Sequence, residues 1–122
     1  MKDNKFLILI PKSEIYIEYM INVINKLPRM EKFSIGNSFK EVMYEMLKNI
    51  IYLSKINNSS RMHYCNLIDS EIVVQRIYIR IMYKSRYIDE KKYNQSIKLL
   101  DEIGKILGGY IKSLGIKYEQ KS

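Results

Sequence analysis

The chain has 122 residues and a formal net charge of +8, from 21 Lys and Arg against 13 Asp and Glu. We expect one domain over residues 1–122, since a chain of this length buries only a modest core. The basic excess favours a polyanion as partner, with an anionic membrane surface as the second candidate. One cysteine, Cys65, rules out an intrachain disulfide, and no apolar run approaches the ~20 residues that span a bilayer. These features predict a soluble protein of the reducing cytoplasm.

The first predicted helix covers residues 11–27. Its apolar residues recur at the spacing of one helix face. That face consists of Tyr16, Met20, Val23 and Leu27. Pro11 suits the first position of a helix, and Pro28 disfavours helical geometry in the residue before it. We therefore expect the helix to begin at Pro11 and to end before Pro28.

The second predicted helix covers residues 34–56, with Ser34 as its N-cap. One face carries mostly apolar residues at helical spacing, namely Ile35, Phe39, Val42, Met46, Ile50 (or Asn49) and Leu53. The polar cluster at residues 57–60 is typical of a loop and separates this helix from the next.

The third predicted helix covers residues 60–85. Its central stripe consists of Cys65, Ile68, Ile72, Gln75, Ile79 and Met82. Four further residues widen the stripe, namely Leu67, Val74, Tyr78 and Ile81. An apolar arc of this breadth indicates contacts on two sides, with the bundle and with a neighbouring subunit.

The fourth predicted helix covers residues 89–114, with Asp89 as N-cap, Gly115 as C-cap and a frayed tail over residues 115–122. Its apolar or small stripe is Tyr93, Ile97, Leu100, Gly104, Leu107, Ile111 and Leu114. Four helices with short connectors predict an all-α fold, an up-down-up-down four-helix bundle.

Glycines interrupt the fourth helix, although each costs a helix about 1 kcal/mol relative to Ala. Gly104 and Gly108 are four residues apart and share one face, so close approach of another backbone would compensate for this cost. We therefore predict a helix-packing or oligomer interface at Gly104, Gly108, Gly109 and Tyr110.

Positive charge is concentrated in the last two predicted helices. Residues 72–88 contain Arg76, Arg80, Lys84 and Arg86 and no acidic residue. In the fourth helix, lysines recur at intervals of seven residues, at Lys91, Lys98, Lys105 and Lys112. Repeated cations suit phosphate contacts, which need no base-reading chemistry. The alternative is a solvated bundle face, on which lysines at heptad spacing are common.

Residues for catalysis are sparse, and we predict neither an enzyme nor a metal or cofactor site. His63 is the only histidine, and it lies about 200° around a helix from Cys65, so the two do not converge on a metal. Cys65 fits a small core residue. A helical ribonuclease of the Arg-x(4–6)-His type is the rival class, but His63 follows Arg61 by only two residues.

Three separated segments resemble the accessory variability determinant family of diversity-generating retroelements. That family carries a Glu-Ile-Gly-Arg/Lys-x-Leu-Gly-Gly-Trp-type motif in its last helix. The matching residues here are Glu102, Ile103, Gly104, Lys105, Leu107, Gly108 and Gly109, with Tyr110 in place of Trp. The first connector matches at Leu27–Arg29 and Lys32–Gly36, and the third helix matches around Val74–Arg80.

The resemblance implies a non-enzymatic accessory protein that binds a reverse transcriptase and assists mutagenic copying of a template RNA into cDNA. It also implies a basic, barrel-shaped homopentamer that binds RNA or DNA with little sequence preference. The alternative is the four-helix bundle type encoded in intervening sequences of ribosomal RNA genes, an RNA-binding protein without a polymerase partner.

Overall fold

The structure is a computed structural model that describes residues 5–57 and 59–121, with side chains as far as residue 115. Within these ranges every regular element is a helix, which confirms the predicted all-α class. The helices are α1 (Phe6–Asn25), α2 (Arg29–Lys32), α3 (Ile35–Lys55), α4 (Arg61–Lys84) and α5 (Glu90–Lys121).

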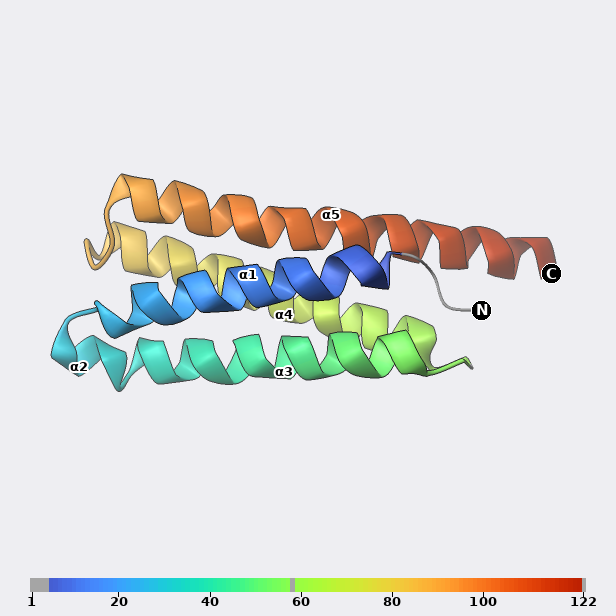
Figure 1. The fold of residues 1–122 in the computed structure, drawn as a ribbon, viewed down its shortest axis with the longest axis horizontal. Coiled ribbons are helices and arrows are strands. Elements are labelled where there is room, and N and C mark those ends of the chain that lie inside the picture. Colours follow the sequence, from blue (N-terminus) through green and yellow to red (C-terminus); the bar gives the residue numbers. More distant parts are fainter. Residues whose placement is uncertain (1–4, 58, 122) are drawn as a thin grey trace.

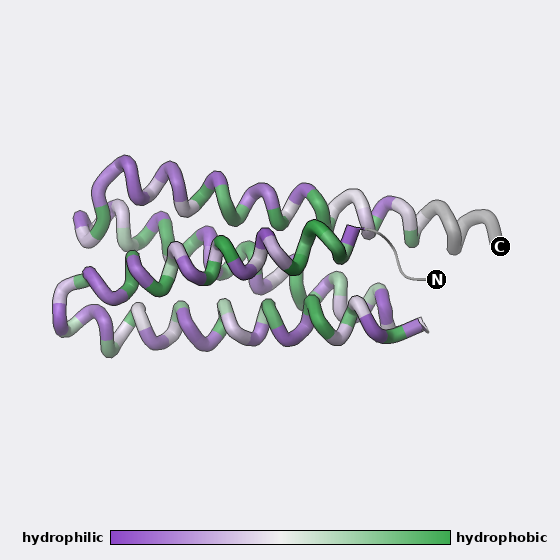
Figure 2. The backbone as a smooth tube through the Cα atoms, viewed as in Figure 1, coloured by the Kyte–Doolittle hydropathy of each residue, from purple (hydrophilic) through white to green (hydrophobic). Residues whose placement is uncertain are grey.

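The four long helices pack around one core. α3 packs on α4, α4 on α5, α5 on α1 and α1 on α3, so each long helix contacts two neighbours (Figure 1). Hydropathy alternates along each of them, as a one-sided core requires (Figure 2). The stripes predicted for α1 and α4 are confirmed, because all of their members are buried.

α1 begins at Phe6, so the predicted start at Pro11 is wrong. A proline inside a helix removes one backbone hydrogen bond and costs about 3 kcal/mol. Burial of the preceding turn offsets this cost, because Phe6 and Leu9 are 7% and 1% exposed. Phe6 also meets the Tyr110 ring of α5 edge-on, with 5.1 Å between the ring centres.

α5 continues past Gly115 to Lys121, so the predicted cap at Gly115 is wrong. No described glycine has the positive φ that such a cap uses. The core-facing stripe of α5 is also displaced from the predicted one, because Ile103 and Tyr110 are buried in place of Gly104 and Ile111.

The connector between α1 and α3, predicted only as a short link between helices, contains a short helix, α2. Its close packing depends on Gly36. A Cβ atom at Gly36 would lie 3.0 Å from Ile24 Cγ2 and 3.2 Å from the Glu31 carbonyl oxygen. Ser34 occupies the N-cap position of α3, but its side chain makes no capping hydrogen bond.

A short polar chain crosses the core between α1 and α4. The buried Tyr16 hydroxyl donates a hydrogen bond of 3.0 Å to Gln75 Oε1. Gln75 Nε2 in turn donates to the Glu71 carbonyl oxygen at 3.1 Å and contacts Met46 Sδ at 3.2 Å. Both side chains are thereby satisfied, as buried polar groups require.

Candidate nucleic-acid and partner interface

The basic residues of α4 that are predicted to contact phosphate are only partly available for binding. Arg76 Nη2 donates a 2.8 Å hydrogen bond to Asp101 Oδ1 of α5, and the Arg76 side chain is only 33% exposed. Arg80 and Lys84 are exposed and lie farther from this ion pair along α4. The stretch that lacks acidic residues in the sequence thus acquires an acidic neighbour from another helix. Asp101 therefore neutralises part of the positive charge that is predicted to contact phosphate.

The lysines that recur at intervals of seven residues run along the outer face of α5, and we call them the lysine line. Its members, Lys91, Lys98, Lys105 and Lys112, are all exposed, and none forms an ion pair within the described residues. Glu102, on the same helix, pairs with α1 and not with these lysines, because Glu102 Oε2 lies 3.1 Å from Lys12 Nζ. The line therefore keeps its full charge toward solvent.

Arg86 lies in the turn between α4 and α5 and has a φ of 63°. Its N–H donates to the Tyr83 carbonyl oxygen at 3.0 Å, and the Tyr87 N–H donates to the Met82 carbonyl oxygen at 2.8 Å. This pair of bonds defines a Schellman motif, in which glycine usually occupies the position of Arg86. Asp89 then caps α5 as predicted, because Asp89 Oδ1 accepts a 2.8 Å hydrogen bond from the Lys92 N–H.

The predicted interface residues of α5 divide into different environments. Beyond the nearby backbone of their own helix, Cβ atoms added at Gly104 and Gly108 would meet no described atom within 4 Å. No other helix among the described residues packs closely against these two glycines, and α4 diverges from α5 toward this end (Figure 1). Gly109 lies beside Lys5, at 3.5 Å from Lys5 Nζ to the added Cβ. Tyr110 is 5% exposed and belongs to the core.

An apolar stripe remains uncovered on the outer face of α4. Its members are Leu67, Val73, Val74, Ile77 and Ile81, with exposures between 37% and 43%. Their spacing of three, four and seven residues is that of a helix contact seam. The sequence predicts a broad apolar arc that includes Leu67, Val74 and Ile81, and the bundle covers only its inner half.

The bAvd-like family model matches residues 7–114 of this chain, a span that includes most of every long helix. The chain belongs to the bAvd-like family. bAvd is the accessory variability determinant of diversity-generating retroelements, an accessory, non-catalytic protein associated with the reverse transcriptase of these elements. No curated protein matches the sequence. Among the described residues, no helix is long and apolar enough to cross a membrane.

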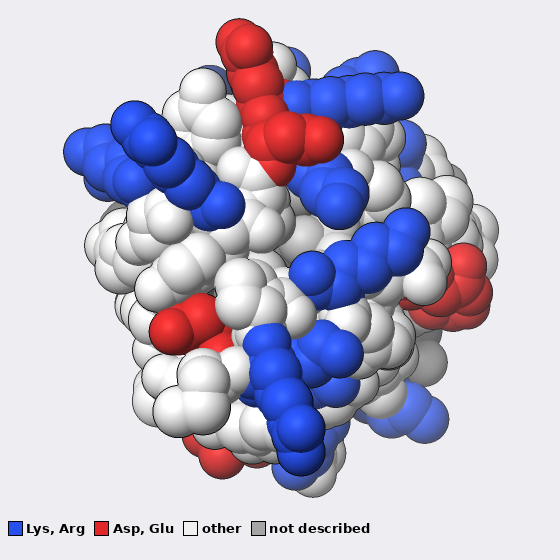
Figure 3. All heavy atoms as spheres, turned by 90° about the vertical axis from the view of Figure 1, so that its left-hand side faces the viewer, with Lys and Arg blue, Asp and Glu red and all other residues white. Residues whose placement is uncertain are grey.

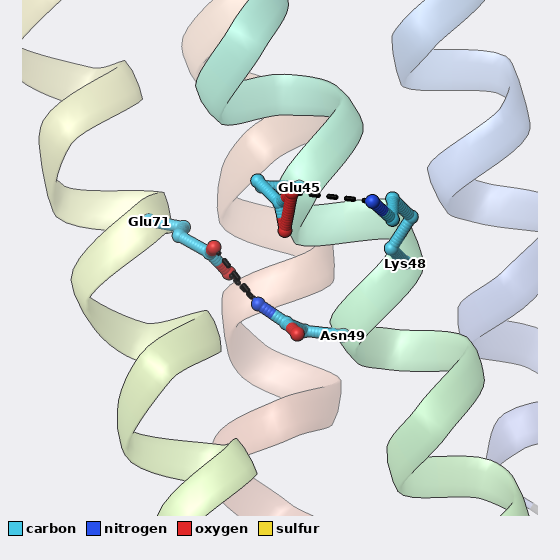
Figure 4. A network of polar contacts seen from close by, with 4 residues as sticks. All are labelled: Glu45, Lys48, Asn49 and Glu71. Carbon is cyan, nitrogen blue, oxygen red and sulfur yellow. Dashed lines mark hydrogen bonds and ion pairs between the residues drawn. The ribbon is translucent and has the colours of Figure 1, made fainter.

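The bAvd-like bundle also contains a polar cluster between α3 and α4 (Figure 4). The buried Asn49 amide donates to both Glu71 carboxylate oxygens, at 3.1 and 2.9 Å. Burial raises the pKa of Glu71, the Asn49 hydrogen bond opposes this shift, and the nearby Glu45 carboxylate adds to it. Lys48 Nζ lies 3.3 Å from Glu45 Oε1 on the solvent side. The cluster ties α3 to α4 and provides no converging donors for a phosphate.

The residues weighed for chemistry lie apart from one another. His63 is exposed and its ring touches that of Tyr64, with 5.4 Å between the ring centres. Cys65 is buried, as predicted for a core residue, and burial raises the pKa of its thiol to about 11. Among the described residues, no group of three His, Cys, Asp or Glu side chains is arranged to hold a metal ion.

Proposed function

We propose that this protein binds the reverse transcriptase of a diversity-generating retroelement together with its template RNA or cDNA, and supports mutagenic reverse transcription without chemistry of its own. The observation that carries the proposal is the basic surface along α4 and α5, whose members form no ion pair among the residues that the structure describes. It comprises Arg80, Lys84, Arg86 and the lysine line at Lys91, Lys98, Lys105 and Lys112. Phosphate contacts need such repeated cations and supply most sequence-independent affinity.

We infer self-association, in agreement with the pentamer that the family resemblance implies. The outer stripe of α4 supports this, because five neighbouring apolar side chains on one helix face are typical of a subunit interface. The open surface at Gly104 and Gly108 lies on the adjacent helix, where a second subunit could approach closely. We also infer the up-down-up-down order of the long helices from the short connectors and their places at alternate ends of the bundle (Figure 1).

The nucleic-acid part of the proposal is tested with the double charge reversal Arg80→Glu and Lys98→Glu. Both parent side chains are exposed and belong to no ion pair among the described residues. Removing two single-strand phosphate contacts lowers the log–log salt slope by about 1.4 and the affinity about 20-fold at ~0.1 M salt. Lys55→Glu with Lys40→Glu is the matched control on α3. Unchanged RNA affinity in the α4–α5 variant contradicts the assignment.

The partner part is tested by co-purification with the reverse transcriptase of a diversity-generating retroelement. Retention of the reverse transcriptase supports the accessory role, whereas RNA binding without retention favours the ribosomal intervening-sequence type. Light scattering measures the subunit number directly, since a pentamer has five times the 14.6 kDa mass of the chain. A monomer at micromolar concentration contradicts the proposed self-association.

A further inference from the structure

The α1–α3 connector and the α4–α5 turn lie at the same end of the bundle (Figure 1). We call this region the basic end, and Lys and Arg side chains spread across it in Figure 3. Its basic residues are Lys26, Arg29, Lys32, Lys84, Arg86, Lys91 and Lys92, and its acidic residues are Glu31, Asp89 and Glu90. Seven cations against three acids leave a net charge of +4, half of the +8 of the whole chain.

A hollow lies in the basic end beside the α4–α5 turn. Lys84, Arg86 and Lys92 line it together with Tyr83, Tyr87, Ile88 and Asp89. Asp89 is the only acid among these lining residues, and its carboxylate is engaged with the Lys92 N–H as the cap of α5. Three cations therefore face one hollow that holds a single, already occupied carboxylate. This composition suits a phosphate group.

The position of Arg86 is unfavourable for an arginine. Its φ of 63° places it in the left-handed region, which residues with a side chain rarely adopt and glycine adopts readily. Arg86 is exposed, so packing does not explain its presence. An arginine in a backbone conformation that favours glycine, on the rim of a cationic hollow, indicates a role for the guanidinium itself.

An exposed aromatic ring completes the basic end. Phe33 follows α2 and is 70% exposed, and Met30 within α2 is 80% exposed. α2 adjoins the α4–α5 turn, since the Glu31 side chain reaches Tyr87: burial raises the pKa of Tyr87, and the charge of the Glu31 carboxylate and its hydrogen bond with Tyr87 raise it further. Tyr83 is less suited to stacking, since one face of its ring already stacks on Tyr93 at 4.4 Å between ring centres.

We propose that the basic end is a binding site for single-stranded nucleic acid, with a phosphate in the hollow held by Lys84, Arg86 and Lys92 and a neighbouring base stacked on Phe33. This inference rests on the proposed function. It places the single strand at the basic end, away from Arg80 and Lys98, where the charge reversals described above are made. An unpaired base offers an open face to an aromatic ring, whereas duplex bases are already stacked. A membrane surface needs diffuse charge and apolar area, and neither explains a discrete cationic hollow.

The decisive variant is Arg86→Gly, measured with a fluorescent 12-nucleotide single-stranded RNA. Relief of the left-handed geometry raises the Tm by about 3 °C. Loss of one phosphate contact weakens RNA binding about fivefold at ~0.1 M salt and lowers the salt slope by about 0.7. Lys55→Ala, at the other end of the bundle, removes the same charge and leaves binding unchanged. A merely structural role for Arg86 would move stability and binding in the same direction.

Phe33→Leu tests stacking while it keeps an apolar side chain. It weakens binding of the single strand about tenfold and leaves binding of a 12-base-pair duplex unchanged. Vesicles of phosphatidylcholine with phosphatidylserine form the third arm. Equal loss for single strand and duplex, or binding to vesicles in preference to RNA, overturns the proposal. Normal RNA binding by both variants also overturns it, while the charge reversals at Arg80 and Lys98 still test the proposed function. No RNA binding by the parent chain overturns both.

Discussion

The structure determines whether alanine at the α5 glycines raises or lowers the free energy of unfolding. Gly104 and Gly108 lie inside a helix, where alanine is more stable than glycine by about 1 kcal/mol per position. Among the described residues, the added Cβ atoms would meet no atom within 4 Å other than the nearby backbone of their own helix. The double variant Gly104→Ala, Gly108→Ala should therefore raise the free energy of unfolding of the monomer by about 2 kcal/mol.

Gly36→Ala is the matched variant with the opposite expected sign. Its Cβ would lie 3.0 Å from Ile24 Cγ2 and 3.2 Å from the Glu31 carbonyl oxygen, which belongs to the backbone and cannot rotate away. Overpacking of this kind costs roughly 1–3 kcal/mol and outweighs the gain in helix propensity of about 1 kcal/mol. We expect a net loss of about 1 kcal/mol.

Urea unfolding followed by circular dichroism measures both variants, at a concentration where light scattering shows a monomer. Loss of monomer stability in the α5 double variant would refute the reasoning, as would a gain in Gly36→Ala. Light scattering at higher concentration adds a second result. If the double variant is more stable as a monomer but no longer associates, a neighbouring subunit fills the space at the two glycines. If association persists unchanged, the subunit interface lies elsewhere, with the outer stripe of α4 as the remaining candidate.

Three further predictions concern the core. Tyr16→Phe leaves Gln75 Oε1 without its 3.0 Å donor, so the free energy of unfolding should fall by about 1–2 kcal/mol, as measured by urea titration. The raised pKa of Glu71 in the fold means that its stability contribution is complete below its ordinary pKa and is lost as pH rises through the folded value. Glu71→Gln should therefore gain stability relative to the parent across that window, and a pH-independent difference would contradict this. Burial and a thiol pKa of about 11 should protect Cys65 from iodoacetamide at neutral pH, and labelling should appear only under unfolding conditions, as mass spectrometry would show.

Much of the fold follows from local patterns in the sequence. The stripes of α1 and α4 and the Asp89 cap depend on spacing and on side-chain chemistry within one turn. For the same reason, the outward direction of the lysine line was predictable from its interval of seven residues. Local rules failed where a tertiary contact outweighed them. Pro11 is tolerated inside α1 because Phe6 packs on Tyr110, nearly the whole length of the chain away.

In the candidate site, too, some features follow from the sequence and others depend on tertiary packing. Sequence alone determined that this chain is helical, basic and similar to the accessory family, because composition, period and motif are properties of the chain itself. Only the tertiary structure decided which cations remain available: Arg76 is paired with Asp101 across helices, whereas Arg86 is held in a left-handed turn beside a cationic hollow. It also decided that Gly104 and Gly108 face open space. Charge neutralisation and steric space depend on neighbours that lie far apart along the chain, and their positions are set only when the helices pack.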